Sequence, residues 1–178
     1  MPGEHNRLNA ALAYEALKAT SLTDDEIFGA LATFPGVPGR LEYVGDIEGV
    51  KVYNDNNATT PQATIKALEA VGDAEKPNVI LLAGGADKGM ELVTFTELIP
   101  RYCKGTVLLA GTGTDRLKEQ VAADVYTDMP TAVNAALSLC APGDVLLFSP
   151  GFASFGLFKN EYDRNDQFVA EISKKIHE

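Results

Sequence analysis

The sequence predicts an α/β protein built on an open, mostly parallel, Rossmann-like sheet with helices on both faces. Short strand patterns alternate with helical patterns through most of the chain. The segments NVILLAG (78–84) and TVLLAG (106–111) are continuously apolar, which is typical of strands buried on both faces. The helical segments between them can serve as the crossovers that parallel strands require. We therefore expect about six strands in one sheet.

Two helices are expected before the sheet begins. Apolar residues recur at helical spacing between residues 5 and 20, and Thr23 followed by Glu26 forms a capping-box pattern that opens a second helix. The segment FPGVPGR (34–40) is rich in proline and glycine and marks a boundary. We expect residues 1–34 to be a short helical tail of a preceding domain, and residues 35–178 to form the α/β domain.

The remaining elements follow from periodicity and turn residues. The first two strands are expected to form a hairpin through GDIEG (45–49). The expected strands are 41–45, 49–55, 78–84, 106–111, 125–127 and 145–149. The expected helices are 61–71, 94–103, 115–122, 130–140 and 162–178.

The composition argues against two classes of partner. The chain has 178 residues, 25 acids and 15 bases, and a formal net charge of −10, without a basic stripe. Nucleic acid and anionic membrane are therefore not expected partners. There is no apolar signal segment, so we expect a cytoplasmic protein, with Cys103 and Cys140 as buried, reduced thiols.

The carboxyl ends of the strands are where a ligand is expected, because open α/β sheets bind ligands at that edge. Four loops follow those ends: YNDNNATT (53–60), AGGADKG (83–89), AGTGTD (110–115) and SPGFASFG (149–156). In the second loop, glycines allow close backbone approach and Lys88 could neutralise a carboxylate or phosphate. A simple glycine turn with a solvated lysine is the alternative.

The other loops also have plain alternatives. AGTGTD lacks the third glycine of a dinucleotide fingerprint, so we expect a turn with Thr114 or Asp115 as helix N-cap. Thr59 or Thr60 could likewise cap the helix that starts near Pro61. In the loop 149–156, hydroxyls and backbone N–H groups could hold a carboxylate.

Two common catalytic motifs are missing from the sequence. It has no GxxxxGK[ST] phosphate loop and no G-x-S-x-G elbow. His177, near the end of the last helix, is expected only to be solvated. We therefore assign no catalytic residue and no metal ligand within this chain.

The order of the motifs resembles the Mur ligase family of ATP-dependent amide-forming enzymes. GEHNRLNAALA (3–13), FPGVPGRLEYV (34–44), YNDNNATTPQAT (53–64), AGGADKG and LLFSPGFASFGLFKN (146–160) follow one another as they do in that family. The resemblance covers essentially the whole chain. Within the family, the nearest pattern is that of the member that adds D-glutamate to UDP-N-acetylmuramoyl-L-alanine in peptidoglycan synthesis.

The resemblance implies a reaction and a set of nucleotide contacts. ATP phosphorylates a substrate carboxylate, and the amine of an amino acid attacks the resulting acyl phosphate. The resemblance places Asn6 and Asn9 at adenine, and Arg40 and Asp55 at the ribose and phosphates. It also implies ATP and Mg²⁺ as cofactors of the whole enzyme. Because the phosphate loop is missing, we expect this chain to be a fragment that is inactive alone. We expect it to bind neither ATP nor Mg²⁺ tightly.

The resemblance also implies an amino-acid site. It places Thr59, Lys88, Ser154 and Phe155 around D-glutamate, with Lys88 offsetting a carboxylate charge. Two alternatives remain open. One is another Mur-type or folylpolyglutamate-synthase-like ligase with a different amino acid. The other is a non-catalytic Rossmann-like module that binds a small anion.

Overall fold

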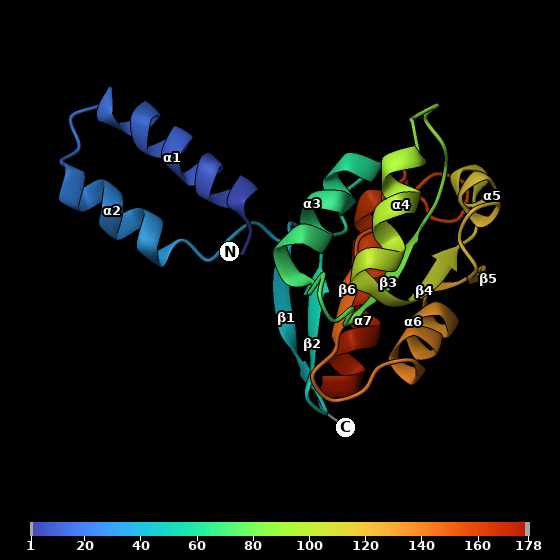
Figure 1. Cartoon of the computed structure of the whole chain (residues 1–178). Coiled ribbons are helices and arrows are strands. Elements are labelled where there is room, and N and C mark those ends of the chain that lie inside the picture. The colour runs from blue at the N-terminus through green and yellow to red at the C-terminus, as the bar shows by residue number, and fades with distance from the viewer. Residues whose placement is uncertain (1, 177–178) are drawn as a thin grey trace.

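The computed structural model describes residues 2–176, which form an α/β body with a helical hairpin projecting from one side (Figure 1). The body contains a six-stranded sheet with the order β1-β2-β6-β3-β4-β5. β1 and β2 pair antiparallel, and the other strand pairs are parallel. The predicted mostly parallel sheet and its hairpin are therefore confirmed. The strands are β1 (Glu42–Ile47), β2 (Val50–Asn54), β3 (Val79–Gly84), β4 (Cys103–Leu109), β5 (Asp124–Tyr126) and β6 (Val145–Phe148).

Helices cover both faces of this sheet, as the sequence predicts. α3 and α4 pack on one face, and α6 and α7 pack on the other (Figure 1). The helices are α1 (Glu4–Lys18), α2 (Asp24–Thr33), α3 (Pro61–Val71), α4 (Val93–Tyr102), α5 (Thr112–Lys118), α6 (Met129–Ser138) and α7 (Glu161–Ile176).

The strand β3 shows why the central strands read as continuous apolar runs. Side chains alternate between the two faces of a strand. Leu81 and Ala83 lie in the core beneath α3 and α4, whereas Ile80 and Leu82 lie in the core beneath α6 and α7. All four are fully buried. Both faces of β3 are thus covered, and the strand's loop emerges at the carboxyl edge of the sheet.

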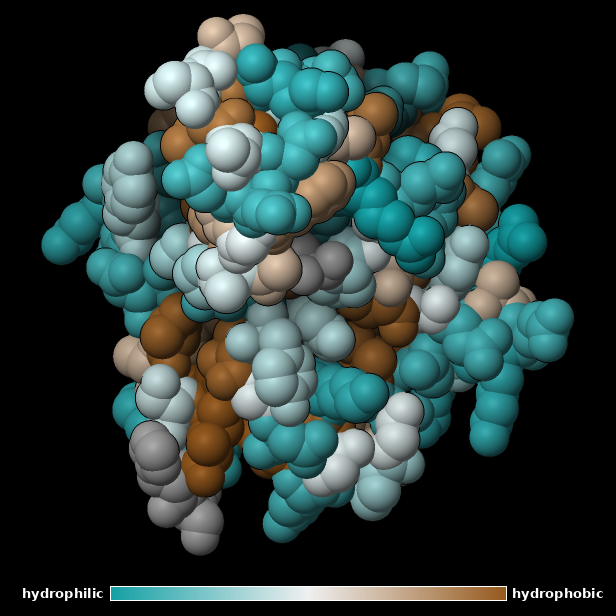
Figure 2. Space-filling view, turned by 90° about the vertical axis from the view of Figure 1, so that its left-hand side faces the viewer, coloured by the Kyte–Doolittle hydropathy of each residue, from teal (hydrophilic) through white to brown (hydrophobic). Residues whose placement is uncertain are grey.

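The helical hairpin of α1 and α2 has little core of its own. Tyr14 and Phe28 stack with their ring centroids 4.9 Å apart. Ile27 is fully buried, whereas Leu8 and Leu12 are each 61% exposed. Figure 2 views the molecule from the side of the hairpin and shows hydrophobic side chains among hydrophilic ones on this face. The amino end of α1 approaches α3, so the hairpin meets the body at one corner (Figure 1).

Two predicted helix starts are confirmed. The Thr23 hydroxyl accepts a hydrogen bond from the Glu26 N–H, and the Glu26 carboxylate accepts one from the Thr23 N–H, which completes the capping box. α3 is capped by Thr60, whose Oγ1 accepts from the N–H of Ala63 at 3.3 Å. Of the two threonines considered, Thr60 is therefore the cap, which leaves Thr59 free for another role.

The prediction that Thr114 or Asp115 caps the helix after β4 is wrong. α5 begins at Thr112, so both residues lie inside it. The hydroxyl of Thr114 is buried and has two other partners: it accepts from the N–H of Gly85 at 3.0 Å and donates to the carbonyl of Leu109. The side chain that the local pattern assigned to a helix cap therefore makes a tertiary contact with Gly85 instead.

Three further expectations concern single residues or segments. Cys103 and Cys140 are free thiols that are half-buried rather than fully buried, and burial raises the pKa of each to about 12. Within residues 2–176, no helix has the length and apolar character needed to cross a bilayer. His177 lies outside the described residues.

Candidate functional site

The four residues predicted to contact a nucleotide line one pocket. Asn6 and Asn9 come from the start of α1, Arg40 from the end of the linker, and Asp55 from the carboxyl end of β2. The pocket has a volume of about 210 Å³. The helical hairpin and the sheet edge thus build this pocket together, which explains why its residues lie far apart in the sequence.

Asp55 is held firmly at the wall of this pocket. Its Oδ1 accepts from the N–H of Leu41 at 3.0 Å, and its Oδ2 accepts from Oγ of Ser149 at 2.7 Å. Burial raises the pKa of Asp55 to about 6, although the hydrogen bonds from Ser149 and Leu41 and the charge of Arg40 oppose the rise. The two carboxylate oxygens of Asp55 therefore join the end of the linker to the carboxyl end of β6.

The backbone of Leu41 is shaped to make this contact. Leu41 is buried and has a φ of 46°, in the left-handed region that costs an L-residue about 1 kcal/mol. This conformation directs its N–H to the Asp55 carboxylate. The strain sits next to Arg40, at the wall of the pocket, where the linker enters the α/β body.

Three further polar residues line the same pocket and were missed from the sequence: His5, Asn57 and Lys66. The Nζ of Lys66 lies 2.6 Å from the Glu69 carboxylate, on the exposed side of α3. Together with Arg40, these residues offer cationic and amide donors, which suit a phosphate and a heterocyclic base. His5 and Asn57 stand inside motifs that the sequence singles out, whereas nothing in the sequence marks Lys66.

A second polar group, Thr59 and Lys88, lies at the same edge of the sheet. The Nζ of Lys88 is 3.3 Å from Oγ1 of Thr59 and 3.5 Å from its carbonyl oxygen. Lys88 is exposed, and an ammonium has three donors, so it can also bind an anion. The N–H of Gly151 donates to the carbonyl of Ala58 at 2.9 Å, which brings the loop after β6 to this corner.

The loop after β6 lies beside the loop that carries Lys88. Ala153 and Ala86 exchange two backbone hydrogen bonds, of 2.9 and 3.1 Å. Ser154 follows directly and is buried, whereas the ring of Phe155 is 63% exposed. The structure thus places the four residues of the predicted amino-acid site on three adjoining loops, with Thr59 and Lys88 in contact.

Arg164 connects the loop after β2 to the loop after β6. It was not recognised as a site residue from the sequence. It lies on α7 and is fully buried. Its Nε and Nη2 donate to the side-chain and main-chain oxygens of Asn56, both at 2.8 Å, and its Nη1 donates to the carbonyl of Phe152 at 3.1 Å. Burial lowers the pKa of Arg164 to about 10, so it stays charged at neutral pH. It holds the loops of β2 and β6 in register.

The described residues hold no cluster of metal-binding side chains. Among residues 2–176, no three His, Cys, Asp or Glu side chains gather closely enough to hold a metal ion. The sheet edge does offer a pocket lined by amide and cationic side chains, and an exposed ammonium at Lys88. Buried hydrogen bonds fix Asp55 at the wall of the pocket.

Comparison with known proteins identifies the family of the chain. Residues 39–152 match the family model described as "Mur ligase, glutamate ligase domain". The chain belongs to the Mur ligase family. The matched segment includes Arg40, Asp55, Thr59 and Lys88, so the two polar groups lie largely within the Mur ligase domain.

Curated Mur ligases are similar over almost the whole chain. The chain is 40% identical over 174 residues to the UDP-N-acetylmuramoylalanine--D-glutamate ligase of Roseiflexus sp., an alignment that covers 93% of the chain and 36% of that enzyme. It is 40% identical over 181 residues to the enzyme of the same name from Geobacillus kaustophilus, covering 98% and 39%. The chain therefore spans less than half the length of these Mur ligases.

Solved structures of Mur ligases and related enzymes share the fold. The structure of UDP-N-acetylmuramate-alanine ligase MurC from Thermotoga maritima matches with a TM-score of 0.71 and 18% identity. The match covers 98% of the present chain and 39% of the MurC chain. MurF ligase from the same organism, in complex with ADP, matches the same shares with a TM-score of 0.67 and 20% identity. A folylpolyglutamate synthase from Mycobacterium tuberculosis, complexed with ADP and AMPPCP, matches with a TM-score of 0.68 and 15% identity. The match covers 98% of the present chain and 41% of the synthase chain. At this identity, the likeness concerns the fold alone.

Proposed function

We propose that this chain is the C-terminal, amino-acid-binding part of a cytoplasmic ATP-dependent ligase that joins D-glutamate to UDP-N-acetylmuramoyl-L-alanine. The observation that carries the proposal is the placement of Lys88 and Thr59 at the same sheet edge as the pocket of Asn6, Asn9, Arg40 and Asp55. The names of the curated relatives support the choice of D-glutamate.

The proposed reaction has two steps. The carboxylate of UDP-N-acetylmuramoyl-L-alanine attacks the γ-phosphorus of ATP, which gives an acyl phosphate and ADP. The amine of D-glutamate then attacks the acyl carbon, loses a proton, and expels inorganic phosphate as the amide forms. Mg²⁺ in the whole ligase would neutralise phosphate charge. Such a reaction depends mainly on the placement of its groups.

Each polar group then has a role in placing a reactant. Asn6 and Asn9 donate to the adenine, while Arg40 attracts the phosphates and Asp55 faces the ribose. Residues 1–34, as the tail of the preceding ATPase domain, would bring the two asparagines to the nucleotide. Residues 35–178, as the C-terminal domain, would supply the rest.

Lys88 would bind a carboxylate of D-glutamate. The substrate carries two carboxylates, and burying them without donors costs several kcal/mol each. The ammonium of Lys88, the hydroxyls of Thr59 and Ser154, and nearby backbone N–H groups provide such donors. The exposed ring of Phe155 would cover the hydrocarbon part of the substrate.

The specificity can be tested on the chain itself by NMR. Isotope-labelled chain would be titrated with D-glutamate, L-glutamate, L-lysine and diaminopimelate. Binding to half of a site is expected to be weak, with a Kd of about 1 mM or higher. We expect D-glutamate to shift the signals of Thr59, Lys88 and Ser154 more than the other three do. Shifts of these signals with another amino acid alone would assign a different substrate to the same ligase fold.

A further inference from the structure

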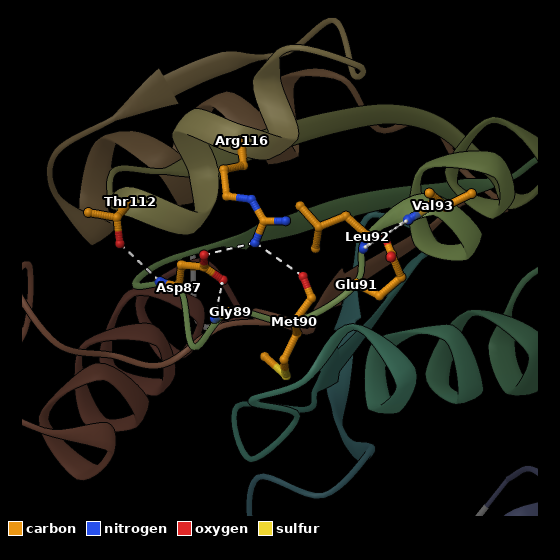
Figure 3. Close-up of polar contacts among 8 residues, drawn as sticks. All are labelled: Asp87, Gly89, Met90, Glu91, Leu92, Val93, Thr112 and Arg116. Atoms are coloured by element: carbon orange, nitrogen blue, oxygen red, sulfur yellow. Dashed lines mark hydrogen bonds and ion pairs between the residues drawn. The ribbon is translucent and has the colours of Figure 1, made fainter.

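The AGTGTD segment (110–115) carries no predicted ligand, yet it holds the loop that bears Lys88. The N–H of Gly113 donates to the carbonyl of Gly85 at 2.9 Å. The Thr112 hydroxyl accepts from the N–H of Asp87 at 3.0 Å, as Figure 3 shows. These bonds come from the start of α5 and fix the backbone of the neighbouring loop just before Lys88.

The two segments also approach too closely for side chains larger than hydrogen. A Cβ on Gly111 would lie 2.3 Å from the carbonyl oxygen of Gly85, and a Cβ on Gly113 would lie 2.2 Å from the ring of Phe152. Such distances are far below van der Waals contact. The two glycines of the segment are therefore explained by packing against the Lys88 loop and the loop after β6, with no dinucleotide needed.

Arg116 completes the support from the next turn of α5. Its Nη1 donates to Oδ2 of Asp87 at 2.8 Å and to the carbonyl of Met90 at 3.1 Å (Figure 3). The other oxygen of Asp87 accepts from the N–H of Gly89 at 2.9 Å. The hydrogen bond from Arg116 lowers the pKa of Asp87, which keeps the ion pair formed at neutral pH. The chain is thus fixed on both sides of Lys88.

The side chain of Lys88 itself has few constraints. It is exposed, and its hydrogen bonds run to the hydroxyl and carbonyl of Thr59, across 29 residues of sequence. A long, exposed lysine gains little from such contacts alone, because ordering its side chain costs conformational entropy. Its direction therefore depends on where the backbone of the loop is held.

We propose that Arg116 and Thr112 are positioning residues for Lys88. By fixing Asp87 and Met90, they hold the ammonium of Lys88 against Thr59, ready for a carboxylate. The carboxylate partner rests on the function proposed above. The Lys88–Thr59 contact rests on the geometry alone, so the two can be tested separately.

The first test needs only the chain. Nuclear Overhauser contacts between the Lys88 side chain and the Thr59 methyl group would be measured in wild type, Arg116→Met and Lys118→Met. Lys118 lies two residues further on α5, is exposed, and has no ion pair among the described contacts. We expect the contact to weaken at least about threefold in Arg116→Met, because loss of the ion pair and its hydrogen bonds frees the loop. The contact should persist in Lys118→Met. An unchanged contact in Arg116→Met would overturn the proposal.

Thr112→Val offers a second, milder variant in case Arg116→Met unfolds. It removes the acceptor for the Asp87 N–H and keeps the shape of the side chain. The same contact should weaken in a chain whose other signals match wild type. Retention of the full contact would count against positioning by Thr112.

The second test uses the whole ligase that carries this chain. We expect Arg116→Met to raise the KM for D-glutamate about tenfold, while kcat changes little. A tenfold rise corresponds to the loss of one charge-assisted hydrogen bond between Lys88 and the D-glutamate carboxylate. Combined with Lys88→Met, Arg116→Met should add nothing further, because both variants remove the same contact. Fully additive effects would overturn the proposal. If Lys88→Met alone leaves KM unchanged, the proposed function is wrong at Lys88, and the contact measured in the chain still decides whether Arg116 positions it.

Discussion

The Oγ atom of Ser149 lies 2.7 Å from Oδ2 of Asp55 and joins the carboxyl ends of β6 and β2, two adjacent strands that are far apart in sequence. Oγ1 of Thr64, on α3, lies 2.9 Å from the same hydroxyl. Asp55, Ser149 and Thr64 are all buried. This small network joins the pocket lined by Asp55 to the centre of the sheet. The strength of its hydrogen bonds depends on whether Asp55 carries a charge.

The stability of the protein should fall as Asp55 ionises. Its pKa is raised from 3.8 to about 6, so the folded state binds the proton more tightly than the unfolded chain does. The stabilising contribution of the proton is therefore complete below about pH 4 and is lost as pH rises through 6. We expect Asp55→Asn, which mimics the protonated acid, to exceed wild type by roughly 3 kcal/mol in free energy of unfolding at pH 8.

Urea denaturation at pH 4 and pH 8 would measure this difference. The advantage of Asp55→Asn should largely disappear at pH 4, where wild type is protonated too. An identical pH dependence in the two proteins would show that Asp55 titrates with an ordinary pKa in the folded state. Such a result would contradict the proposed effect of burial on the pKa of Asp55.

Ser149→Ala should be most damaging when Asp55 is charged. The variant leaves Oδ2 of the buried carboxylate without its hydroxyl donor, and a hydrogen bond to a charged group contributes about 1.5–3 kcal/mol. We expect a loss of that size at pH 8, a smaller loss at pH 4, and a further rise in the Asp55 pKa, which carboxyl NMR titration can follow. Equal losses at both pH values would mean that Ser149 serves packing alone.

Arg164→Met should destabilise the protein and loosen the loops after β2 and β6. The variant leaves oxygens of Asn56 and Phe152 without the donors that Arg164 provides, at a cost of about 3 kcal/mol or more. Arg164→Lys should not restore the loss, because an ammonium cannot reproduce the planar fork. Lys159→Met, an exposed change nearby, is the control and should stay within about 0.5 kcal/mol of wild type. Recovery of full stability by Arg164→Lys would contradict this account.

Gly113→Ala tests the close packing between α5 and the loop after β6. The new Cβ would lie 2.2 Å from the Phe152 ring, so we expect a loss of about 1–3 kcal/mol and a displaced ring. Gly29→Ala, in α2, is the matched change with no heavy atom within 4 Å. It should stabilise α2 by up to about 1 kcal/mol, because alanine favours the helix. Thermal unfolding of both variants measures the contrast, and a neutral Gly113→Ala would show that this packing is loose.

The sheet could be predicted because its signals are local. Continuous apolar runs such as residues 79–84 are buried on both faces, and the turn residues between 45 and 49 set the hairpin. The cap of α5 could not be predicted, because the hydroxyl of Thr114 is drawn into a tertiary contact with Gly85. Local propensity yields to such contacts when they satisfy buried backbone groups.

The candidate site could be predicted only in part. The resemblance to the Mur ligases brought out Asn6, Arg40, Asp55 and Lys88, because each stands in a segment that follows the motif order of that family. Arg164 was missed because its partners at Asn56 lie 108 residues away, a pairing that no local pattern shows. Residues that hold loops in place have no characteristic spacing in the sequence, because only the fold brings them together.

The central claim is that the edge around Lys88 selects D-glutamate in an ATP-dependent ligase. The most direct measurement is amide formation by the whole ligase, with ATP, UDP-N-acetylmuramoyl-L-alanine and each of several amino acids, followed by mass spectrometry of the product. We predict one product, with D-glutamate added and one ADP released per amide, and a raised KM for D-glutamate in Lys88→Met. A product with a different amino acid in place of D-glutamate, or a Lys88→Met enzyme with wild-type KM for D-glutamate, would contradict the claim.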